Sequence, residues 1–565
     1  NYLANYLKIL IGVIPEIALI NVNHPEGIDE LIWKEKLARF TYKRPYLWPN
    51  HINAINTNYL NKGISSVISF PTGGGKSTLS ELKILTSIIL DEPVIFIVPT
   101  LALVDQVSNS LKSIFPEASM KDNYEEFSSD DSSLPNISVM TPESCLVKLN
   151  FNPELFSNLG LFVFDECHLL NPKSTDNMDR RSIDAMICLL KIIESAPNTD
   201  LLMLSAMLSN SEEISAWLQS IIGKDVVPLT LNWKPTQQVK GCVVYKNDDI
   251  VQLKRFIRTA PKTTSNKLTT QAKRELNITP YGFFSLNQTW HSTRIRDYKL
   301  SRLTSSNVLL TINNFNQLTS NRNVVAAKIA MNSTNSKIKT LVFGLTRNDC
   351  ESIVKEISRN QTRTIDFLEK EQVLFDLLIE EFGNSSCLYV SNESGSLPHH
   401  GLLTKNERLL HEMLFKRDSG VDSLVATSTL AQGINLPAEL VIIAGDLRFD
   451  AELENQELLE AHELLNAAGR AGRAGKNSKG MVLIVPGKVV EYNQSERRIT
   501  NHWHSLKEIF TNSDRCLDLA DPFEYMLDKI HLSQTVDEDT IYFLNTLSTD
   551  NIDRLVNKSF IAYKK

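Results

Sequence analysis

Short apolar runs alternate along this chain with longer stretches in which apolar residues recur at helical spacing. In the first half of the chain, the runs lie at 64–70, 94–98, 137–140, 161–164 and 200–204. Strands of a parallel sheet read as such runs because both of their faces are buried, and helices cover the sheet. The pattern therefore predicts a doubly wound, parallel α/β domain over residues 47–245.

The same alternation returns near residue 323. A strand and turn are predicted over 338–348, further strands at 423–427, 440–444 and 480–486, and helices at 365–382, 405–417 and 457–468. The expected order of parts is a helical lead-in (1–46), a first α/β domain (47–245), a linker or insertion (246–322), a second α/β domain (323–490) and a mostly helical region (491–565).

Length and composition set the broad class. A chain of 565 residues is too long for one core, and 42% hydrophobic with 22% charged residues is ordinary for a globular protein. No apolar run reaches the roughly 20 residues of a membrane-spanning helix, so we expect no membrane association. The chain begins with Asn1 rather than Met, so we expect it to be part of a longer protein.

Cysteine usage and charge narrow the chemistry. The seven cysteines include no Cys-x-x-Cys pair, which argues against structural zinc, an iron–sulfur cluster or a disulfide framework, and favours a cytoplasmic location. A net charge of −7 gives no support to a generally basic nucleic-acid binder. A nucleic acid would have to be held in a local channel, largely by backbone amides and hydroxyls.

A glycine-rich stretch, Phe70–Thr78, joins the first predicted strand to a predicted helix. Strand, glycine turn and helix form the context in which backbone N–H groups and a helix N-terminus hold a polyphosphate. Lys76 would then reach the β- and γ-phosphates, and the Ser77 hydroxyl would bind Mg²⁺. Phe70 stands where this pattern usually has its first glycine, so a flexible surface turn is the alternative interpretation.

Two adjacent carboxylates, Asp165 and Glu166, end the all-apolar run 161–164. Open α/β sheets bind ligands at this edge, where Asp165 would hold Mg²⁺ and Glu166 would orient or deprotonate the attacking water. A pair of solvated acids is the alternative. On chemistry alone, His168 is more often a hydrogen-bonding structural residue.

Further along, Arg470 and Arg473 lie three residues apart among small residues, with the permanent charge and fork geometry that suit phosphate contacts. Residues 246–322 are rich in Lys and Arg and carry Trp290 and Tyr298, which is compatible with a nucleic-acid path. A solvated connector is the alternative for that segment.

Taken in order, these motifs resemble those of superfamily 2 helicases, and in particular of the Ski2-like branch. They are Pro71–Ser77, Pro99-Thr100, Thr141–Glu143, Asp165–His168, Ser205–Met207, Ala426–Pro437 and Gly469–Arg473. The resemblance covers roughly residues 47–490 and implies two RecA-like domains that bind ATP and Mg²⁺ between them.

The resemblance also implies roles for single residues. The ATP site would comprise Thr72, Gly73, Gly74, Gly75, Lys76, Ser77, Thr78, Asp165 and Glu166 of the first domain, and Gly433, Asn435, Arg470 and Arg473 of the second. His168 and Ser205 would couple ATP state to motion. Contacts with a nucleic-acid backbone would come from Pro99, Thr100, Thr141, Pro142, Thr346, Arg347, Thr427, Ser428 and Thr429. Residues 446–461 would carry a strand-separating hairpin, and 491–565 would begin a winged-helix region.

Four features depart from the family pattern. His51 stands where a base-reading Gln is usual, Met207 replaces a Thr thought to couple the domains, and Asn466 replaces a usual Gln. Residues 474–478 lack the Asp that often follows the Gly469–Arg473 motif. None of them alters Lys76 or the carboxylates, so we expect ATP hydrolysis to be retained.

The expected function is that of an ATP-driven helicase or translocase moving 3′→5′ on single-stranded or forked nucleic acid, with DNA favoured. The resemblance extends to Hachiman-type antiviral-defence helicases, which would imply a bacterial defence or genome-maintenance role and a protein partner such as a nuclease. An RNA helicase of the Ski2-like type is one alternative, and an ATP-gated clamp that binds nucleic acid without unwinding it is another.

Overall fold

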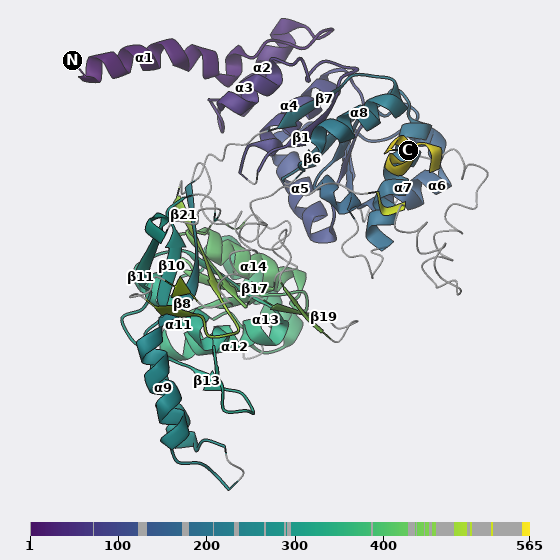
Figure 1. Ribbon diagram of the computed structural model, residues 1–565. Helices are drawn as coiled ribbons and strands as arrows, with labels where there is room; N and C mark the ends of the chain where they lie inside the picture. The colour runs from purple at the N-terminus through teal and green to yellow at the C-terminus, as the bar shows by residue number, and fades with distance from the viewer. Residues whose placement is uncertain are drawn as a thin grey trace, which may run out of the picture. The chain divides into compact units, whose positions relative to one another are not determined.

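The computed structural model forms two compact units, each described here by itself: unit 1 comprises residues 1–233 and 516–565, and unit 2 residues 234–515. The residues that it describes are 2–71, 73–121, 133–171, 180–206, 208–230, 237–264, 267–287, 290, 295–385, 388–391, 393–427, 436, 438–445, 447–450, 455–458, 479–493, 498–499, 521–523 and 556–564. Each unit contains a large sheet covered by helices, which confirms the predicted tandem α/β architecture (Figure 1).

Unit 1 is built on a parallel sheet in the order β3-β4-β2-β5-β6-β1-β7. Its strands are β1 (Ser65–Ser69), β2 (Val94–Ile97), β3 (Met120–Lys121), β4 (Ile137–Met140), β5 (Leu161–Phe164), β6 (Asp200–Ser205) and β7 (Val226–Thr230). Between β1 and β2 the chain passes over β6 and β5, and between β6 and β7 it passes over β1, so the strand that precedes the glycine-rich turn lies inside the sheet.

Helices cover both faces of this sheet. They are α3 (Pro49–Ile55), α4 (Lys76–Ile89), α5 (Leu101–Ile114), α6 (Pro142–Phe151), η2 (Pro153–Phe156), η3 (Cys167–Leu170), α7 (Arg180–Ser195) and α8 (Ser211–Ile222). Strand residues alternate between two cores: Val94 and Phe96 pack with α4 and α5, whereas Ile95 and Ile97 pack with α6, α7 and α8. This alternation is the packing expected of a strand that is buried on both faces.

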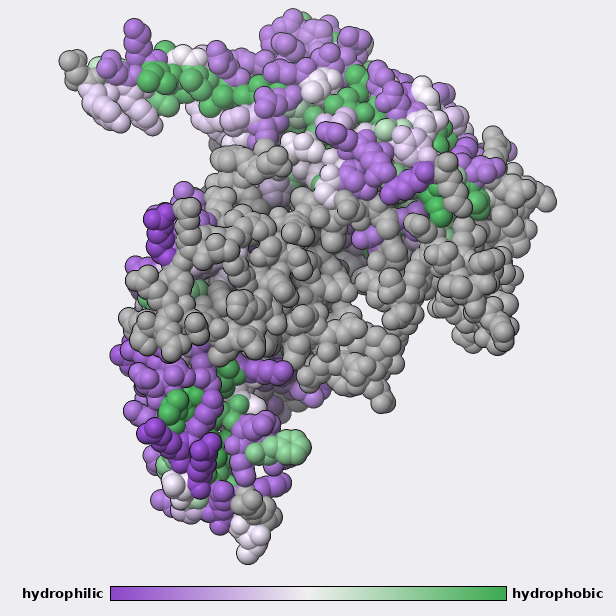
Figure 2. All heavy atoms as spheres, in the orientation of Figure 1, coloured by the Kyte–Doolittle hydropathy of each residue, from purple (hydrophilic) through white to green (hydrophobic). Residues whose placement is uncertain are grey.

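The lead-in contains α1 (Tyr2–Ile17), η1 (Leu19–Asn21) and α2 (Glu30–Thr41). Asp29 caps α2 by accepting from Leu31 N at 2.9 Å, and Trp33 and Leu37 are buried in the core of unit 1. Helix α1 buries no residue, and its apolar side chains form the green band along that helix in Figure 2. Among the described residues, no helix is both long and apolar enough to span a membrane.

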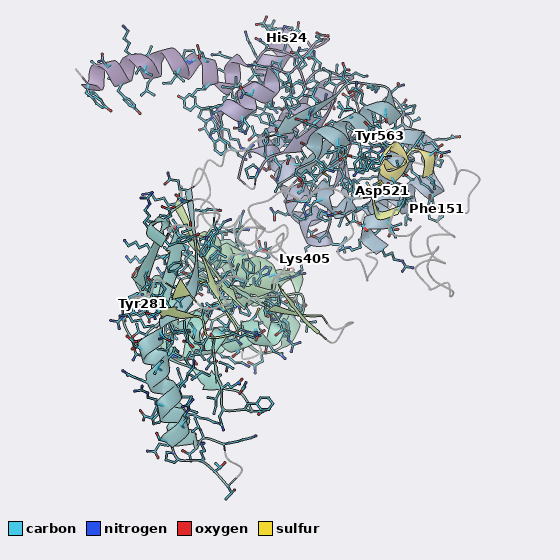
Figure 3. All side chains as sticks on the ribbon, in the orientation of Figure 1. His24, Phe151, Tyr281, Lys405, Asp521 and Tyr563 are labelled. Atoms are coloured by element: carbon cyan, nitrogen blue, oxygen red, sulfur yellow. The ribbon has the colours of Figure 1, made fainter. Side chains whose placement is uncertain are left out.

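The last residues of the chain belong to unit 1. Helix α20 (Phe560–Lys564) places Phe560 against Trp217 of α8, whose Nε1 donates to Lys558 O at 3.0 Å. Asp521 accepts from Ile561 N at 2.6 Å, which ties the two described C-terminal pieces together (Figure 3). The sequence alone does not predict that the C-terminal residues pack on unit 1, because this packing joins segments about 340 residues apart.

Unit 2 has a mixed sheet in the order β11-β10-β8-β21-β18-β15-β17-β16. From β8 to β16 the pairs are parallel, whereas β10 and β11 join antiparallel at the other end. The strands are β8 (Gln237–Lys246), β10 (Tyr281–Ser285), β11 (Tyr298–Arg302), β15 (Thr340–Gly344), β16 (Leu397–His399), β17 (Ser423–Thr427), β18 (Leu440–Ala444) and β21 (Lys479–Val485). Smaller pairings involve β9 (Asn277–Ile278), β12 (Val308–Leu309), β13 (Thr311–Ile312), β14 (Leu318–Thr319), β19 (Leu447–Asp450), β20 (Asn455–Leu458), β22 (Glu491–Asn493) and β23 (Arg498–Ile499).

The helices of unit 2 cover its sheet in the same two-sided way. They are α9 (Asn247–Thr259), α10 (Thr270–Arg274), η4 (Ile295–Asp297), α11 (Arg322–Asn335), α12 (Arg347–Asn360), α13 (Glu369–Phe382) and α14 (Lys405–Lys416). Val342 of β15 packs with α11 and α12, whereas its neighbours Leu341 and Phe343 pack with α13 and α14.

Three predicted boundaries need correction. The first unit ends at Trp233 rather than at 245, because β8 hydrogen-bonds to β21 and β10 of the second sheet. Residues 246–322 are not a solvated connector: α9 buries Ile250 and Ile257 in the core of unit 2, and β10 and β11 extend its sheet. The region 491–565 is divided between the units, since β22 pairs with β8 while α20 packs on unit 1. The predicted winged helix lies largely outside the described residues.

Candidate nucleotide and nucleic-acid sites

The glycine-rich turn lies between β1 and α4 of unit 1. Gly73 and Gly75 both have left-handed backbones, with φ of +81° and +90°, and Lys76 is the first residue of α4. A side chain would be strained at either glycine, so the glycines are needed for the turn itself. The turn leaves the N–H groups at the start of α4 facing the end of the sheet, which is the arrangement that holds phosphate. Thr72 lies outside the described residues.

Lys76 points back over this turn. Its Nζ donates to the Phe70 carbonyl oxygen at 3.2 Å, so the ammonium group lies across the loop at the N-terminus of α4. The same ammonium group acts electrostatically on Asp165, whose pKa it lowers against other, larger effects. The structure therefore brings Lys76 and Asp165 to one edge of the sheet.

Asp165 and Glu166 follow β5 at that edge. The Asp165 carboxylate accepts from Glu166 N at 3.0 Å, and Glu166 has a left-handed backbone with φ of +53°. Burial, together with the neighbouring Glu166 carboxylate, raises the pKa of Asp165 above its usual range. A half-buried carboxylate beside a helix that begins with Lys76 and Ser77 is a donor set that fits Mg²⁺, because a divalent cation would stabilise the charged form of Asp165.

His168 connects the two strand ends. Its Nδ1 lies 3.3 Å from Glu166 Oε2 and 3.5 Å from Ser205 Oγ, at the end of β6. Ser205 is fully buried and is followed by Met207, which lies outside the described residues. The structure thus brings together His168 and Ser205, the two residues for which the resemblance implied a coupling role. His168 also contacts the carboxylate of Glu166, so it could respond to changes at that carboxylate.

Two contacts around the glycine-rich turn (residues 70–78, called the phosphate turn) were not predicted from the sequence, one from Arg44 of the lead-in and one from Asn50 of α3. Arg44 Nη1 donates to Thr78 Oγ1 at 3.1 Å and forms an ion pair with Glu81, both in α4. Asn50 Nδ2 donates to the Gly74 carbonyl oxygen at 2.7 Å. Asn50 lies next to His51, a position that the sequence singled out, whereas nothing in the local pattern distinguishes Arg44 from other surface cations.

His51 lies under the phosphate turn rather than in the open. Its ring stacks on Trp48 at 5.4 Å, and its Nδ1 accepts from Trp48 N at 3.3 Å, which leaves the proton of the neutral ring on Nε2. Nε2 is buried with no hydrogen-bond partner, and a Cβ at Gly75 would lie only 1.9 Å from it. Burial lowers the pKa of His51 to about 4, so the ring is neutral at physiological pH.

Two turns that were predicted to contact nucleic acid follow neighbouring strands of unit 1. Thr100 Oγ1 accepts from Leu103 N at 3.4 Å and caps α5, and Thr141 Oγ1 accepts from Ser144 N at 3.4 Å and caps α6. The capping hydroxyl of Thr100 still has its own proton to donate, so Thr100 can serve the helix and a phosphate at once. Pro142 is the first residue of α6, where its fixed φ suits a helix start.

The corresponding edge of unit 2 is described only in part. Thr346 caps α12 in a capping box with Asp349, and Arg347 Nε lies 3.0 Å from Glu351 Oε1. Thr427 ends β17 next to Gly344, the last residue of β15. The other predicted site residues of this unit lie outside the described residues: Ser428, Thr429, Gly433, Asn435, Arg470 and Arg473.

A two-stranded antiparallel sheet occupies the segment predicted to carry a hairpin. β19 pairs with β20, and Leu447 faces Leu458 in register while Asp450 faces Asn455. The pair lies between β18 and β21 in sequence, and its own sheet is separate from the main sheet of unit 2. A hairpin outside the main sheet is free to serve a purpose other than packing the core.

Two family descriptions match large parts of this chain. The family described as DEAD/DEAH box helicase matches residues 48–214, and the helicase conserved C-terminal domain matches residues 322–475. Together the two matches contain every site residue assigned above except Arg44.

Similar proteins include the Hachiman protein HamB of Bacillus cereus, 25% identical over 462 residues that are 79% of this chain and 36% of that protein. The ATP-dependent DNA helicase Hel308 of Methanocella arvoryzae is 23% identical over 80% of this chain and 52% of its own length. The DExH-box ATP-dependent RNA helicase DExH10 of Arabidopsis thaliana is 23% identical over 78% of this chain and 41% of its own length. The chain thus spans about a third to a half of these relatives.

Proposed function

The chain belongs to the DEAD/DEAH-box helicases of superfamily 2, and on that premise we propose that it hydrolyses ATP to move along nucleic acid and separate its strands. One observation carries the proposal: the phosphate turn, Asp165, Glu166 and His168 meet at the carboxyl edge of a single parallel sheet. Such a constellation positions a triphosphate and a water for phosphoryl transfer.

We assign the chemistry to unit 1 residues. Backbone N–H groups from Gly73 to Thr78 bind the phosphates, and Lys76 leaves the Phe70 carbonyl to neutralise charge on the γ-phosphate. Ser77 and Asp165 would hold Mg²⁺, which would supply charge neutralisation at the phosphates. Glu166, whose backbone is fixed by the bend after β5, orients the attacking water.

The family resemblance supports a contribution from unit 2. In the proposal, Gly433 and Asn435 contact the nucleotide, and Arg470 and Arg473 stabilise charge on the transferred phosphoryl group. His168 and Ser205 respond to the state of Glu166, since His168 contacts both side chains.

Nucleic acid runs, in the proposal, along Pro99, Thr100, Thr141 and Pro142 of unit 1. Thr346, Arg347 and Thr427–Thr429 of unit 2 provide further contacts. The movement is 3′→5′, as the family resemblance implies, and the substrate is DNA. Similarity to the DNA helicase Hel308 over 80% of the chain supports the choice of DNA. The β19–β20 hairpin supports strand separation rather than a passive clamp, because a protruding hairpin can part a duplex that is pulled against it.

The defence role rests on similarity to the Hachiman protein HamB over 79% of the chain. From this similarity and the resemblance to Hachiman-type helicases, we propose a bacterial, cytoplasmic setting and a nuclease as protein partner. Similarity to the RNA helicase DExH10 over 78% of the chain favours RNA as the second candidate track.

The test is steady-state ATPase activity of the purified chain with single-stranded DNA, single-stranded RNA or neither, beside a Lys76→Ala variant. We expect stimulation of at least about tenfold by DNA, less by RNA, and none in the variant. Greater stimulation by RNA than by DNA would identify RNA as the nucleic acid along which the protein moves. No stimulation by either polymer would refute the proposed function.

A further inference from the structure

The two predicted nucleic-acid turns of unit 1 lie side by side. β2 and β4 are parallel neighbours, with Ile97 opposite Met140, and Val98 N donates to Met140 O at 3.0 Å immediately beyond the strands. The turns that follow open α5 and α6, whose N-termini therefore face the same edge of the sheet. Two adjacent helix N-termini can bind successive phosphates of one strand only if their spacing is held constant.

Arg181, near the start of α7, bridges these turns from a third element. Its Nη2 donates to the Pro99 carbonyl oxygen at 2.9 Å, and its Nε lies 3.5 Å from Glu143 Oε1 in the first turn of α6. The guanidinium is planar and rigid, so one side chain fixes both partners at a set separation. A lysine ammonium, although equally charged, is a point donor on a flexible stem and would not fix that separation.

Helix α7 also connects these turns to the catalytic acids. Cys167 and Leu170 of η3, directly after Asp165 and Glu166, pack in one buried core with Ile183 and Ile187 of α7. A displacement of the 99–100 and 141–143 turns would thus shift the start of α7, which packs against η3 at the end of β5. Interiors are close-packed, so such a displacement is transmitted rather than absorbed.

We propose that Arg181 is a positioning residue that holds the 99–100 and 141–143 turns together, and so determines how tightly a single strand binds and how strongly it stimulates ATP hydrolysis. The inference rests on the proposed function, in which these turns contact the nucleic-acid backbone. It assigns Arg181 no part in phosphoryl transfer.

Arg181→Ala and Arg181→Lys test the proposal against wild type. Loss of a charge-assisted bridge raises the half-saturating concentration of single-stranded oligonucleotide in the ATPase assay roughly tenfold, while basal kcat and the KM for ATP stay within about twofold. Lysine keeps the positive charge but lacks the forked guanidinium. We therefore expect the half-saturating oligonucleotide concentration of Arg181→Lys to be raised nearly as much as that of Arg181→Ala. Full rescue by lysine would show that only charge matters and would overturn the positioning role.

Lys191→Ala is the matched control, because Lys191 also lies on α7 and its Nζ contacts Asn150 Oδ1 of α6 at 2.6 Å. We expect it to leave the half-saturating concentration unchanged. Amide hydrogen exchange at Leu103 and Ser144, in the first turns of α5 and α6, gives a readout without nucleic acid and should accelerate in Arg181→Ala but not in the control.

A Glu143→Ala background completes a double-mutant cycle. If Arg181 acts by bridging, part of its effect disappears once Glu143 is gone, whereas independent effects add. Wild-type activity that no polynucleotide stimulates would overturn the proposed function and this inference together. A stimulated wild type with an unaltered Arg181→Ala variant would overturn this inference alone.

Discussion

The carboxyl edges of the two sheets carry different chemistry. In unit 1, the edge has a phosphate turn and the adjacent carboxylates Asp165 and Glu166. In unit 2, the described part of the edge carries Arg347, paired with Glu351, and His399, which lies 3.2 Å from Glu412. Both units have the same layered architecture, so the architecture alone does not determine which edge performs catalysis.

This difference indicates which unit serves ATP hydrolysis and which serves strand separation. The described acids and the phosphate turn of unit 1 suit hydrolysis, whereas unit 2 adds an extra hairpin outside its main sheet. We therefore expect changes in unit 1 to alter turnover and changes in the hairpin of unit 2 to alter strand separation.

The largest effect is expected for Glu166→Gln. Removal of the group that orients the water should lower kcat for ATP by about 10³-fold, while nucleotide binding persists because the phosphate turn is intact. Glu412→Gln is the matched change at the edge of unit 2 and should alter basal kcat less than about twofold. Measured kcat values for the two variants check this; comparable losses would erase the distinction between the edges.

Unit 1 has a buried ion pair at the amino ends of its central strands, and unit 2 has a half-buried ion pair at the equivalent place. Lys83 lies 3.0 Å from Asp200, whose second cation, Lys224, is 4.0 Å away. Lys339 lies 3.4 Å from Asp422, which has a closer second partner, at 2.5 Å, in Arg363. Lys83→Met leaves Asp200 buried with less compensation and should lower the free energy of unfolding by about 3 kcal/mol.

Lys339→Met should lower the free energy of unfolding by only about 1 kcal/mol, because Arg363 continues to neutralise Asp422. Denaturant unfolding followed by tryptophan fluorescence measures both variants. A larger loss for Lys339→Met than for Lys83→Met would contradict the assignment.

Acid stability should also distinguish the units. The pKa of His51 is lowered to about 4 from an ordinary value near 6.5, so below pH 6.5 the unfolded chain takes up a proton that the folded chain does not. The contribution of neutral His51 to the free energy of unfolding is therefore complete above pH 6.5. It declines as the pH falls and is smaller by about 2 kcal/mol at pH 5.

His51→Gln removes this dependence from unit 1. Burial also lowers the pKa of His411 in unit 2, to about 3, so a residual acid loss from that unit should persist in the variant. The check is the free energy of unfolding of both proteins at pH 5 and pH 7.5. An equal acid loss in the two proteins would contradict a buried, neutral His51.

The smallest effect concerns the hairpin of unit 2. Replacing residues 447–458 by a Gly/Ser linker should reduce strand separation roughly tenfold, because the fork would no longer meet a rigid obstacle, while the nucleic-acid-stimulated ATPase stays within about twofold. Parallel helicase and ATPase assays separate the two outcomes. Unwinding at the wild-type rate would remove the hairpin from the mechanism.

The architecture of both units could be read from the sequence to a large extent. Runs such as 94–98 and 161–164 are almost wholly apolar because both faces of those strands are buried, and Gly73, Lys76 and the acidic pair stand at strand ends where ligands bind. These are local signals that need no knowledge of distant contacts.

What the sequence did not predict depends on contacts between distant segments. Arg44, Asn50 and Arg181 matter because of the groups that they touch on other elements, and no spacing distinguishes them from solvated side chains. Strand β8 reads like the last strand of the first domain, but its hydrogen bonds lead into the second sheet. The packing of Phe560 on Trp217 likewise joins residues that are far apart in the sequence.

The central claim is that ATP hydrolysis at the edge of unit 1 drives directed strand separation. Displacement of a labelled strand from forked DNA with either a 3′ or a 5′ single-stranded tail, with and without ATP, tests this claim most directly. The account predicts ATP-dependent separation of the 3′-tailed fork, little separation of the 5′-tailed fork, and none by Glu166→Gln. Forks that stay paired under ATP while ATP is hydrolysed would contradict it.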